Sequence, residues 1–597
     1  MKRLLLICYL VVALACAAWA DANVHILEVG LNGRCVPYRP CSVLVSVLNP
    51  YSTLQDFELQ VSLRFAPGLE RSDAQQTYIH RLTLGPREVR EIDAPIEPSR
   101  GGSIVDVTLR LPEGKIIDHN LVDAKERMWT RGKYLVGVLC REESICKGIQ
   151  AQIQLGGSSK DRDAKNQNLE LAMPLRQRFQ SWSYAPASII VVAIPANSLR
   201  GDERSALESF ARGGGSLVLL EDVFADQTFL ADYRPAAGGH NGIAIGSGRL
   251  YRIPRLSGDT LGALFSGEEL DLLVQGNRAN WSGYELNSLR GQYATRFGFP
   301  SWWTLLIWLA IYILLVGVAN FAILRRFRRR EWGWLTVAAI ALLFVFALYW
   351  LASRRGPRQV TVDYMAVHHL DSHSNRAFTA YGVRVSVPQK QQITLKSPDN
   401  ALLYPRLPYV DEYRGGFRTV QLGRRFIHGY DGITNTGWDP IPGSQIVVPM
   451  QRRTSRDLQF AGITSFSGTV RETVSNHLRN ETGQRFFDAI FVDSGQRRIW
   501  LLGEVTPGAE IDLSKVRYEP PGLCDTVAFT RSTRGSESKS DDFFLSEFAC
   551  AWLDSRASNT TPTRRFYGLS TGPAESAQPL NVRYRQQQYA LTEVVFQ

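Results

Sequence analysis

Six cysteines carry the most specific chemistry in this sequence, because they lie in three local pairs. They are Cys35, Cys41, Cys140, Cys146, Cys524 and Cys550; two further cysteines, Cys8 and Cys16, lie near the N-terminus. The simplest connectivity joins the neighbours in each pair. Disulfides persist in oxidising compartments and are rare in the cytosol, so the pairs predict an exported protein. Six unrelated buried thiols are the alternative, and a zinc site is disfavoured because no histidine or cysteine cluster completes either short pair.

One cluster contains residue types that bind metal ions, the run from His368 to His373 (HHLDSH). On a strand, His369, Asp371 and His373 would share a face and form a set of two histidines and one carboxylate. The run from Asp371 to Asn375 is typical of a turn, however, and a turn would break that geometry. We therefore expect solvated polar residues at the end of a strand and predict neither a metal ion nor another cofactor.

A candidate ligand cleft involves a run of three glycines, Gly213, Gly214 and Gly215. Glu221 and Asp222 follow the next apolar run, and His240 lies in a later glycine-containing loop. Ligands of open α/β sheets bind outside the carboxyl ends of the parallel strands, which suggests a shallow cleft here. The alternative is that the glycines only end a helix. A hydrolase that uses Glu221, Asp222 and His240 is a further hypothesis.

The first twenty residues have the pattern of a signal peptide. Met1-Lys2-Arg3 is a cationic start, Leu4 to Ala15 is an apolar run, and Ala18-Trp19-Ala20 supplies small residues for cleavage before Asp21. An uncleaved anchor helix and a lipoprotein modified at Cys16 are the alternatives. The apolar run is short for a helix that crosses a bilayer.

Two later segments, 303–324 and 333–352, are long and apolar enough to be transmembrane helices. The loop between them, 325–332, carries Arg325, Arg326, Arg328, Arg329 and Arg330. Short loops this rich in arginine lie on the cytoplasmic side of a membrane, although arginines after the second segment argue mildly for the opposite orientation. The sequence therefore predicts a two-pass protein of the bacterial inner membrane, with residues 21 to about 300 and 356–597 both in the periplasm.

The regions on either side of the two apolar segments differ in pattern. Residues 21–128 contain short β-prone runs separated by turn residues, which is typical of an immunoglobulin-like β-sandwich. In residues 132–275, a buried-type strand (188–194), an amphipathic helix (202–212) and a second strand (216–220) form a parallel crossover unit. Residues 356–597 are again β-rich and predict a further sandwich domain.

The stretch SIIVVAIPANSLRGDERSALESFARGGGSLVLLEDV, which begins at Ser188, resembles a known family. It is similar to the class I glutamine-amidotransferase-like (flavodoxin-like) domain of bacterial envelope membrane proteins. The order of sandwich, α/β domain, two-helix hairpin and C-terminal β domain also resembles that family over most of the chain. The resemblance implies an association with MoxR-type AAA+ ATPases and with von Willebrand factor A-type envelope proteins.

The chemistry of an amidotransferase is not visible in the residues. Such an enzyme needs a cysteine on a tight strand-to-helix turn, with a histidine and a carboxylate to activate it. No cysteine lies between Cys146 and Cys524, Cys140 lacks flanking glycines, and Ser216 begins a strand. We therefore predict a pseudoenzyme, that is, a non-catalytic, membrane-anchored scaffold for recognition or assembly. An extracytoplasmic hydrolase acting on an envelope glycan or peptide, and a ligand-sensing module, are the alternatives.

The net charge of +11 is spread along the chain, and part of it lies in the arginine-rich loop. A basic surface suits anionic lipid headgroups or acidic envelope polymers. Nucleic acid is a poor partner for an exported protein without a binding motif. The expected partners are the lipid bilayer and other envelope proteins.

Overall fold

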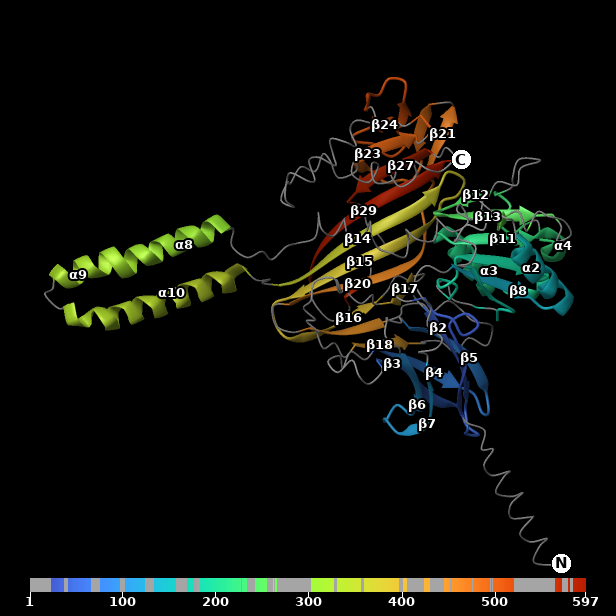
Figure 1. The fold of residues 1–597 in the computed structure, drawn as a ribbon, viewed down its shortest axis with the longest axis horizontal. Helices are drawn as coiled ribbons and strands as arrows, with labels where there is room; N and C mark the ends of the chain where they lie inside the picture. The colour runs from blue at the N-terminus through green and yellow to red at the C-terminus, as the bar shows by residue number, and fades with distance from the viewer. Residues whose placement is uncertain are drawn as a thin grey trace, which may run out of the picture.

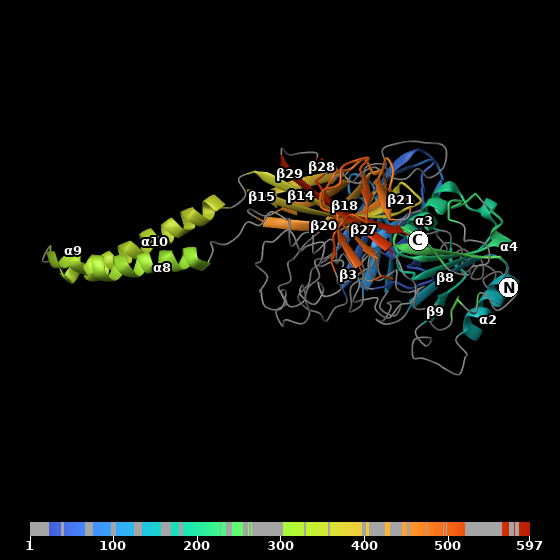
Figure 2. The same cartoon turned by 90° about the horizontal axis from the view of Figure 1, so that it is seen from above.

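The computed structural model of the chain describes the secondary structure of residues 23–36, 41–65, 76–96, 103–123, 134–156, 169–176, 178, 183–226, 228–233, 242–254, 261, 264–265, 302–326, 330–355, 359–396, 401–404, 424–429, 445–450, 454–474, 476–493, 495–496, 498–519, 564–571, 578–579 and 584–596. In these residues a helical hairpin projects from one end of a β-rich body (Figures 1 and 2). An α/β sheet lies at the opposite end of the body, far from the hairpin.

The N-terminal strands form a β-sandwich, because alternate apolar residues face one core. In β3, for example, Phe57, Leu59 and Val61 are buried at every second position. One sheet has the order β1-β2-β5, and β3, β4, β6 and β7 belong to the other. The bounds are β1 Val24–Val29, β2 Cys41–Leu48, β3 Gln55–Phe65, β4 Gln76–Leu84, β5 Val89–Ile96, β6 Ser103–Arg110 and β7 Ile116–Asp123.

The sandwich is continuous with strands that follow the helical hairpin. Strand β4 pairs in parallel with β18 (Arg424–Gly429), which extends the second sheet to eight strands in the order β28-β16-β19-β18-β4-β3-β6-β7. The hydrophobic core of the sandwich also includes Val362 and Tyr364 of β14 and Val383 of β15. The segments before and after the hairpin, which the sequence analysis treated as separate, therefore share one core.

The α/β sheet contains five parallel strands and one antiparallel edge strand, in the order β12-β13-β11-β10-β8-β9. Its central strands are buried on both faces, which explains their continuous apolar runs. The predicted crossover is confirmed, since β10 and β11 pair in parallel on either side of α3. The bounds are β8 Tyr134–Cys140, α2 Glu143–Gly156, β9 Leu169–Ala172, β10 Ile189–Ala193, α3 Gly201–Arg212, β11 Ser216–Leu220, α4 Glu221–Phe224, β12 Ile243–Ile245 and β13 Gly248–Ile253.

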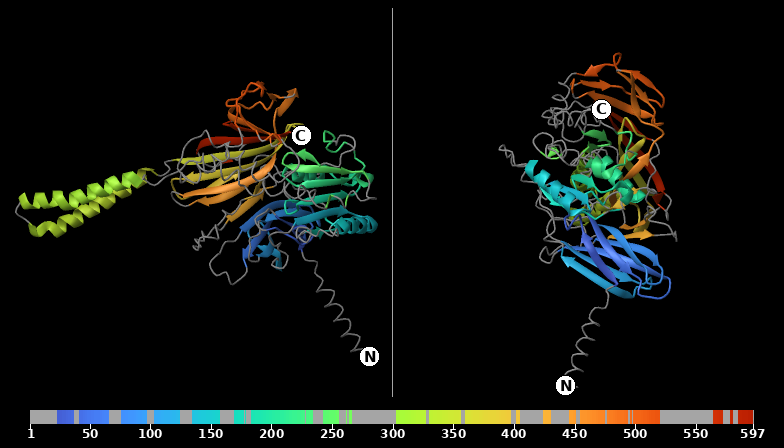
Figure 3. Two further views of the ribbon diagram at one scale, coloured as in Figure 1. Left: turned by 45° about the horizontal axis from the view of Figure 1, so that its top comes forward. Right: turned by 90° about the vertical axis from the view of Figure 1, so that its right-hand side faces the viewer.

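The C-terminal strands form a nine-stranded sheet in the order β17-β20-β15-β14-β29-β27-β23-β24-β26 and a small sheet in the order β21-β22-β25. In Figure 3 these two sheets extend from beside the sandwich, at the bottom, to the top of the body. The strands that follow the hairpin, of which β16, β18, β19 and β28 belong to the eight-stranded sheet, are β14 Val360–Asp371, β15 Arg376–Val387, β16 Gln391–Lys396, β17 Ala401–Tyr404, β18 Arg424–Gly429, β19 Gln445–Met450, β20 Thr454–Ser465, β21 Val470–Val474, β22 His477–Asn480, β23 Phe486–Asp493, β24 Arg498–Leu501, β25 Glu510–Asp512, β26 Tyr518–Glu519, β27 Arg564–Ser570, β28 Gln578–Pro579 and β29 Tyr584–Phe596.

The hairpin consists of two antiparallel helical arms. The first comprises α8 (Trp302–Leu314), a π-helical turn (Leu315–Ala319) and α9 (Asn320–Arg326), and the second is α10 (Gly333–Arg355). The ring of Phe344 packs between the arms, 5.5 Å from the ring of Trp308 and 4.9 Å from that of Tyr312.

Candidate functional site

Two of the three predicted disulfides are present. Cys35 bonds to Cys41 and Cys140 bonds to Cys146, and the Cα atoms of each pair are 5.7 Å apart. Cys524 and Cys550 lie outside the described residues. The two bonds indicate an oxidising, extracytoplasmic environment.

The helical hairpin exposes the largest collection of apolar side chains on the described surface. Trp303, Val318, Leu342 and Phe346, for example, are each about 70% exposed. Over the described residues, one helical stretch, Leu306–Arg326, is long and apolar enough to cross a membrane, and Gly333–Leu348 is a shorter apolar helix. Arg325 and Arg326 end α9, and Arg330 begins a short 3₁₀ turn before α10; Arg328 and Arg329 lie outside the described residues.

The structure does not bring the residues of the predicted ligand cleft together. Gly213, Gly214 and Gly215 directly precede β11, whereas Glu221 and Asp222 directly follow it. A strand of five residues separates its two ends by about 16 Å. His240 lies outside the described residues.

The three glycines instead shape the turn from α3 into β11. Gly214 has a φ of +105°, and a Cβ on Gly215 would lie 2.2 Å from the ring of Phe210. A residue with a side chain at position 215 would therefore push the helix away from the sheet. These contacts agree with the alternative that the glycines end a helix.

The predicted turn after His369 is present, and it separates the three candidate metal ligands. His369 and Asp371 lie in β14, while His373 lies in the turn to β15. The expectation of solvated side chains is wrong for the strand residues, because His369 and Asp371 are buried; His369 pairs with Glu593 and Asp371 with Arg212. Within the described part of the chain, no group of three or more histidine, cysteine, aspartate or glutamate side chains is arranged to hold a metal ion.

Asp371 connects the α/β sheet to the C-terminal sheet. Its Oδ2 atom accepts hydrogen bonds from Arg212 Nη1 at 3.1 Å, Tyr233 Oη at 2.7 Å and the backbone N–H of Gly246 at 3.0 Å. Its Oδ1 atom accepts from the backbone N–H groups of the turn at positions 373 and 374. Arg212 and Asp371 are both buried. Because three of these donors come from the α/β region, this buried carboxylate is a central part of the contact between the two sheets.

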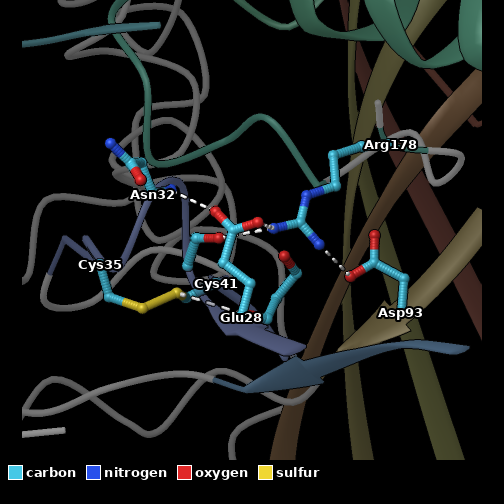
Figure 4. Close-up of a disulfide and its surroundings, with 8 residues drawn as sticks. Glu28, Asn32, Cys35, Cys41, Asp93 and Arg178 are labelled. Atoms are coloured by element: carbon cyan, nitrogen blue, oxygen red, sulfur yellow. Dashed lines mark hydrogen bonds and ion pairs between the residues drawn. A yellow bond between two sulfur atoms is a disulfide. The ribbon is translucent and has the colours of Figure 1, made fainter. Parts of the chain in front are cut away.

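A second buried connection joins the sandwich to the α/β region (Figure 4). Arg178 is fully buried, and its guanidinium lies between Glu28, at 3.0 Å, and Asp93, at 3.5 Å. Arg178 Nη2 also donates to the carbonyl of Gly30 at 2.7 Å, and Ser183 Oγ donates to Asp93 at 2.5 Å. Burial raises the pKa of Asp93 above its ordinary value, and the charge of Arg178 opposes that shift.

The buried cluster around Glu593 contains several titratable groups. Glu593 accepts hydrogen bonds from Arg565 and from Tyr567 Oη, the latter at 3.1 Å, and pairs with His369 Nδ1 at 2.6 Å. Burial alone would raise the pKa of Glu593, but Arg565 and His369 outweigh burial and hold that pKa below its usual range. These side chains form hydrogen bonds with one another across neighbouring strands of the sheet. The cluster is therefore suited to stabilising the pairing of strands β14, β27 and β29.

His368 gives the fold a pH dependence. Burial lowers the pKa of His368 to about 3, and the neighbouring His369 adds to the effect. The ring contacts Phe466, and its Nδ1 lies 2.8 Å from Thr379 Oγ1. The neutral imidazole is therefore the form that fits the folded chain, and protonation favours unfolding.

Acidification is expected to destabilise the protein through His368. The pKa of His368 is lower in the folded chain than in the unfolded chain. The stability that the neutral His368 ring contributes is therefore fully present above about pH 6.5 and is lost as the pH falls below that value. Between pH 7.5 and 5.0 the loss from this group is about 2 kcal/mol. Urea unfolding at both pH values should show a smaller loss in His368→Gln than in the wild type, whereas His373→Gln should behave like the wild type. Equal losses in all three proteins would contradict the assignment.

A pocket of about 350 Å³ lies at the carboxyl ends of β8 and β10. The end of β8 contributes Leu139, Cys140 and the next residue, Arg141, to the lining of the pocket, and Ile194 follows the end of β10. Strands β8 and β10 are neighbours in the sheet. The strand that follows β8 in the chain, β9, lies on the outer side of β8, whereas the strand that follows β10, β11, lies on the opposite side of the pair. The two strands thus form the topological switch point, which is where open α/β sheets bind ligands.

The remaining walls of the pocket come from the sandwich and from the segment after β9. Leu44 of β2 and Glu91 of β5 line it from the sandwich, and Leu175 and Arg176 line it from the segment after β9. The backbone N–H of Leu175 donates to the carbonyl of Val138 at 2.9 Å, and a Cβ on Gly137 would lie 2.5 Å from Leu175 Cδ1. The wall is therefore packed directly on β8.

No local pattern in the sequence marks Arg178, Arg212 or the two pocket arginines, Arg141 and Arg176, as important residues. Arg178 and Arg176 belong to a segment without periodicity, and Arg212 is an ordinary basic residue in the last turn of a helix. These arginines become important only through their neighbours in the folded chain, which belong to strands β2, β5 and β14 and are distant in sequence. Only the position of Cys140 at a strand end gave a signal for the pocket, since it marked the carboxyl end of β8.

Comparison with known proteins does not assign a family. No protein-family model and no curated protein matches the chain. Among solved structures, a β-glucuronidase 2 from Bacteroides uniformis has 13% identity over 37% of this chain and 24% of that chain, with a TM-score of 0.13. This chain thus matches about a quarter of the length of the glucuronidase.

Two other solved structures show equally low similarity. An Escherichia coli α-2-macroglobulin fragment, from domain MG7 to the C-terminus, has 10% identity over 74% of this chain and 94% of that chain, with a TM-score of 0.14. A Kluyveromyces marxianus β-glucosidase in complex with glucose has 8% identity over 80% and 46% of the two chains, with a TM-score of 0.09. We infer no activity from values this low.

Proposed function

We propose that the protein is a non-catalytic scaffold of the bacterial inner membrane, which holds a rigid recognition module outside the cytoplasm. In this proposal the hairpin crosses the membrane twice, and its arginine-rich loop faces the cytoplasm. The sandwich, the α/β sheet and the C-terminal sheets all lie in the periplasm.

The shared hydrophobic core carries the proposal. Residues before the hairpin, such as Val61, and residues after it, such as Val362 and Val383, belong to one core. Two segments that pack together must lie on the same side of a membrane, so an even number of crossings must separate them. The exposed apolar surface of both helical arms supports two crossings. The disulfides in the segment before the hairpin support the oxidising side.

The internal connections support a recognition role over a catalytic one. The charged side chains that are most buried, such as Arg178, Arg212 and Glu593, are engaged in contacts between sheets or between strands. Such contacts hold surfaces in a fixed arrangement. The α/β sheet lies at the end of the body away from the hairpin (Figures 1 and 2), a position from which it can meet a partner beyond the bilayer. An amidotransferase-like ancestry and a MoxR-type ATPase partner remain part of this proposal.

Labelling of single added cysteines tests the topology. Val89→Cys in the sandwich and Lys515→Cys in the C-terminal region introduce thiols at positions that are 61% and 82% exposed, and Glu331→Cys introduces one in the loop. A membrane-impermeant maleimide, applied to cells with a permeabilised outer membrane, should label the first two and should label Glu331→Cys only after lysis. The unmodified protein is the control for background. Protection of Lys515→Cys before lysis would contradict the proposal.

Co-purification tests the scaffold role. The tagged protein, extracted in mild detergent, should recover a defined envelope component or a MoxR-type ATPase at a fixed ratio. A tagged two-pass membrane protein of unrelated sequence is the control. Recovery of the same components by both proteins, or of none by the tagged protein, would count against an assembly role.

A further inference from the structure

We infer that the pocket at the carboxyl ends of β8 and β10 binds a small carboxylate-bearing amine, such as a free amino acid or a dipeptide. This inference deepens the proposed recognition role, because it names what the α/β sheet would recognise. It does not depend on the hairpin or on a protein partner.

The position of the pocket is the first argument. It lies at the topological switch point, and the sandwich closes it from the side through Leu44 and Glu91. Its volume of about 350 Å³ is at the lower end of the range for small-molecule sites. A ligand of one or two amino-acid residues fits this size, whereas a folded domain does not.

The charges of the lining are the second argument. Arg141 and Arg176 reach the same pocket from different segments, and Glu91 faces them from the sandwich. Arg176 Nε lies 4.0 Å from Glu28 Oε2, at the outer limit of an ion pair, and its side chain is 55% exposed. Guanidinium groups bind planar carboxylates with paired hydrogen bonds. Two of them in one pocket therefore favour a carboxylate ligand.

Glu91 distinguishes a carboxylate-bearing amine from a phosphate. A phosphate carries up to two negative charges and would be repelled by a carboxylate in the same small pocket. An amino acid places its carboxylate near the arginines and can direct its ammonium group toward Glu91. The apolar side chains of Leu139, Leu175 and Ile194 then offer contacts for an aliphatic side chain.

The walls of the pocket are held in place before a ligand binds. The Cys140–Cys146 disulfide ties the end of β8 to α2. Arg178, two residues beyond Arg176, is fixed between Glu28 and Asp93 of the sandwich. A site whose walls are already fixed loses little freedom on binding, which favours affinity for a small ligand.

Calorimetric titration of the full chain in detergent tests the inference. The probes are L-leucine, L-alanyl-L-leucine, the C-terminal amides of both, N-acetyl-L-leucine and inorganic phosphate. We expect saturable binding of the free acids, about tenfold weaker binding of the amides, and weaker binding of phosphate than of leucine. Arg141→Gln and Arg176→Gln should each weaken acid binding about tenfold and should abolish the preference of acid over amide when combined. Glu91→Gln should weaken leucine more than N-acetyl-L-leucine.

A matched control separates these effects from a general loss of positive charge. Arg485→Gln removes an exposed arginine of the C-terminal region and should leave leucine binding unchanged. All these variants should keep the thermal unfolding midpoint of the wild type, because the side chains replaced are exposed. Absence of saturable binding, equal affinity for acid and amide, or a preference for phosphate would overturn the inference. Such a result would leave the topology and co-purification results unaffected, so the two proposals fail separately.

Discussion

Replacing Arg178 by methionine is expected to lower the free energy of unfolding by about 3–5 kcal/mol, because it leaves Glu28 and Asp93 as buried carboxylates without their cation. The methionine fills most of the same volume, so the loss reports on charge and hydrogen bonding. Urea unfolding followed by tryptophan fluorescence measures it. Arg176→Met is the matched control, since its weak contact with Glu28 is largely exposed to solvent. Its effect should stay within about 0.5 kcal/mol.

The pH dependence of this variant provides a second measurement. Burial already raises the pKa of Asp93, and loss of Arg178 removes the charge that opposes the rise. A carboxyl group whose folded pKa is raised contributes stability at low pH, and that stability is lost as the pH rises through the folded value. Arg178→Met should therefore lose more stability than the wild type as the pH rises above about 4, the ordinary pKa of an aspartate, because the folded pKa of Asp93 is raised further in the variant. Adding Asp93→Asn should recover part of the loss; no recovery would show that the two residues act independently.

Asp371→Asn is expected to cost a similar amount, about 3–5 kcal/mol, although it changes the shape of the side chain very little. The carboxylate of Asp371 accepts from Arg212, Tyr233, Gly246 and two N–H groups of the turn. An asparagine amide group would direct its own N–H atoms at some of these donors, and Arg212 would keep only Glu208, at 2.8 Å, as a buried counter-charge. The contact between the α/β sheet and the C-terminal sheet should therefore loosen.

Limited proteolysis and urea unfolding together measure this second effect. Cleavage between the two sheets should become faster in Asp371→Asn and in Arg212→Met, and the double variant should be less impaired than the sum of the two. Arg376→Met, which removes a half-exposed partner of Glu208, is the control and should cost at most about 1 kcal/mol. An Asp371→Asn protein that unfolds and is cleaved like the wild type would contradict the role of this carboxylate.

The sequence predicted elements that depend on local pattern and missed contacts that depend on distant pairing. The predicted strands at 188–194 and 216–220 match β10 and β11, and the predicted helix at 202–212 matches α3, because apolar runs and helical periodicity are local signals. The disulfides of the two short pairs were predictable for the same reason. Strands β5 and β7 were not predicted, because their runs contain polar residues at mixed spacing. The antiparallel edge strand β12 was not predicted because it is only three residues long.

The candidate site could not be predicted because its residues meet only in the folded chain. The three glycines gave the strongest local signal, yet they lie at the amino end of β11, away from the switch point. The pocket unites the ends of β8 and β10 with residues of β2 and β5, and no spacing in the sequence relates these four strands. The cluster at 368–373 similarly contained the residue types of a metal site. The register of β14 with β29 instead places His369 opposite Glu593.

The shared core also determines the order in which parts of the chain can fold while the chain is being synthesised. Strands β1 to β7 emerge first, but part of their core is supplied by Val362 and Val383, which are made only after both helical arms. Strand β14 must in turn wait for β29, which is the last strand among the described residues and pairs with β14 along its whole length. Contacts between segments so distant in sequence form slowly and leave apolar strands uncovered in the meantime. The N-terminal half should therefore need a holding chaperone until β29 has been made and can pair with β14.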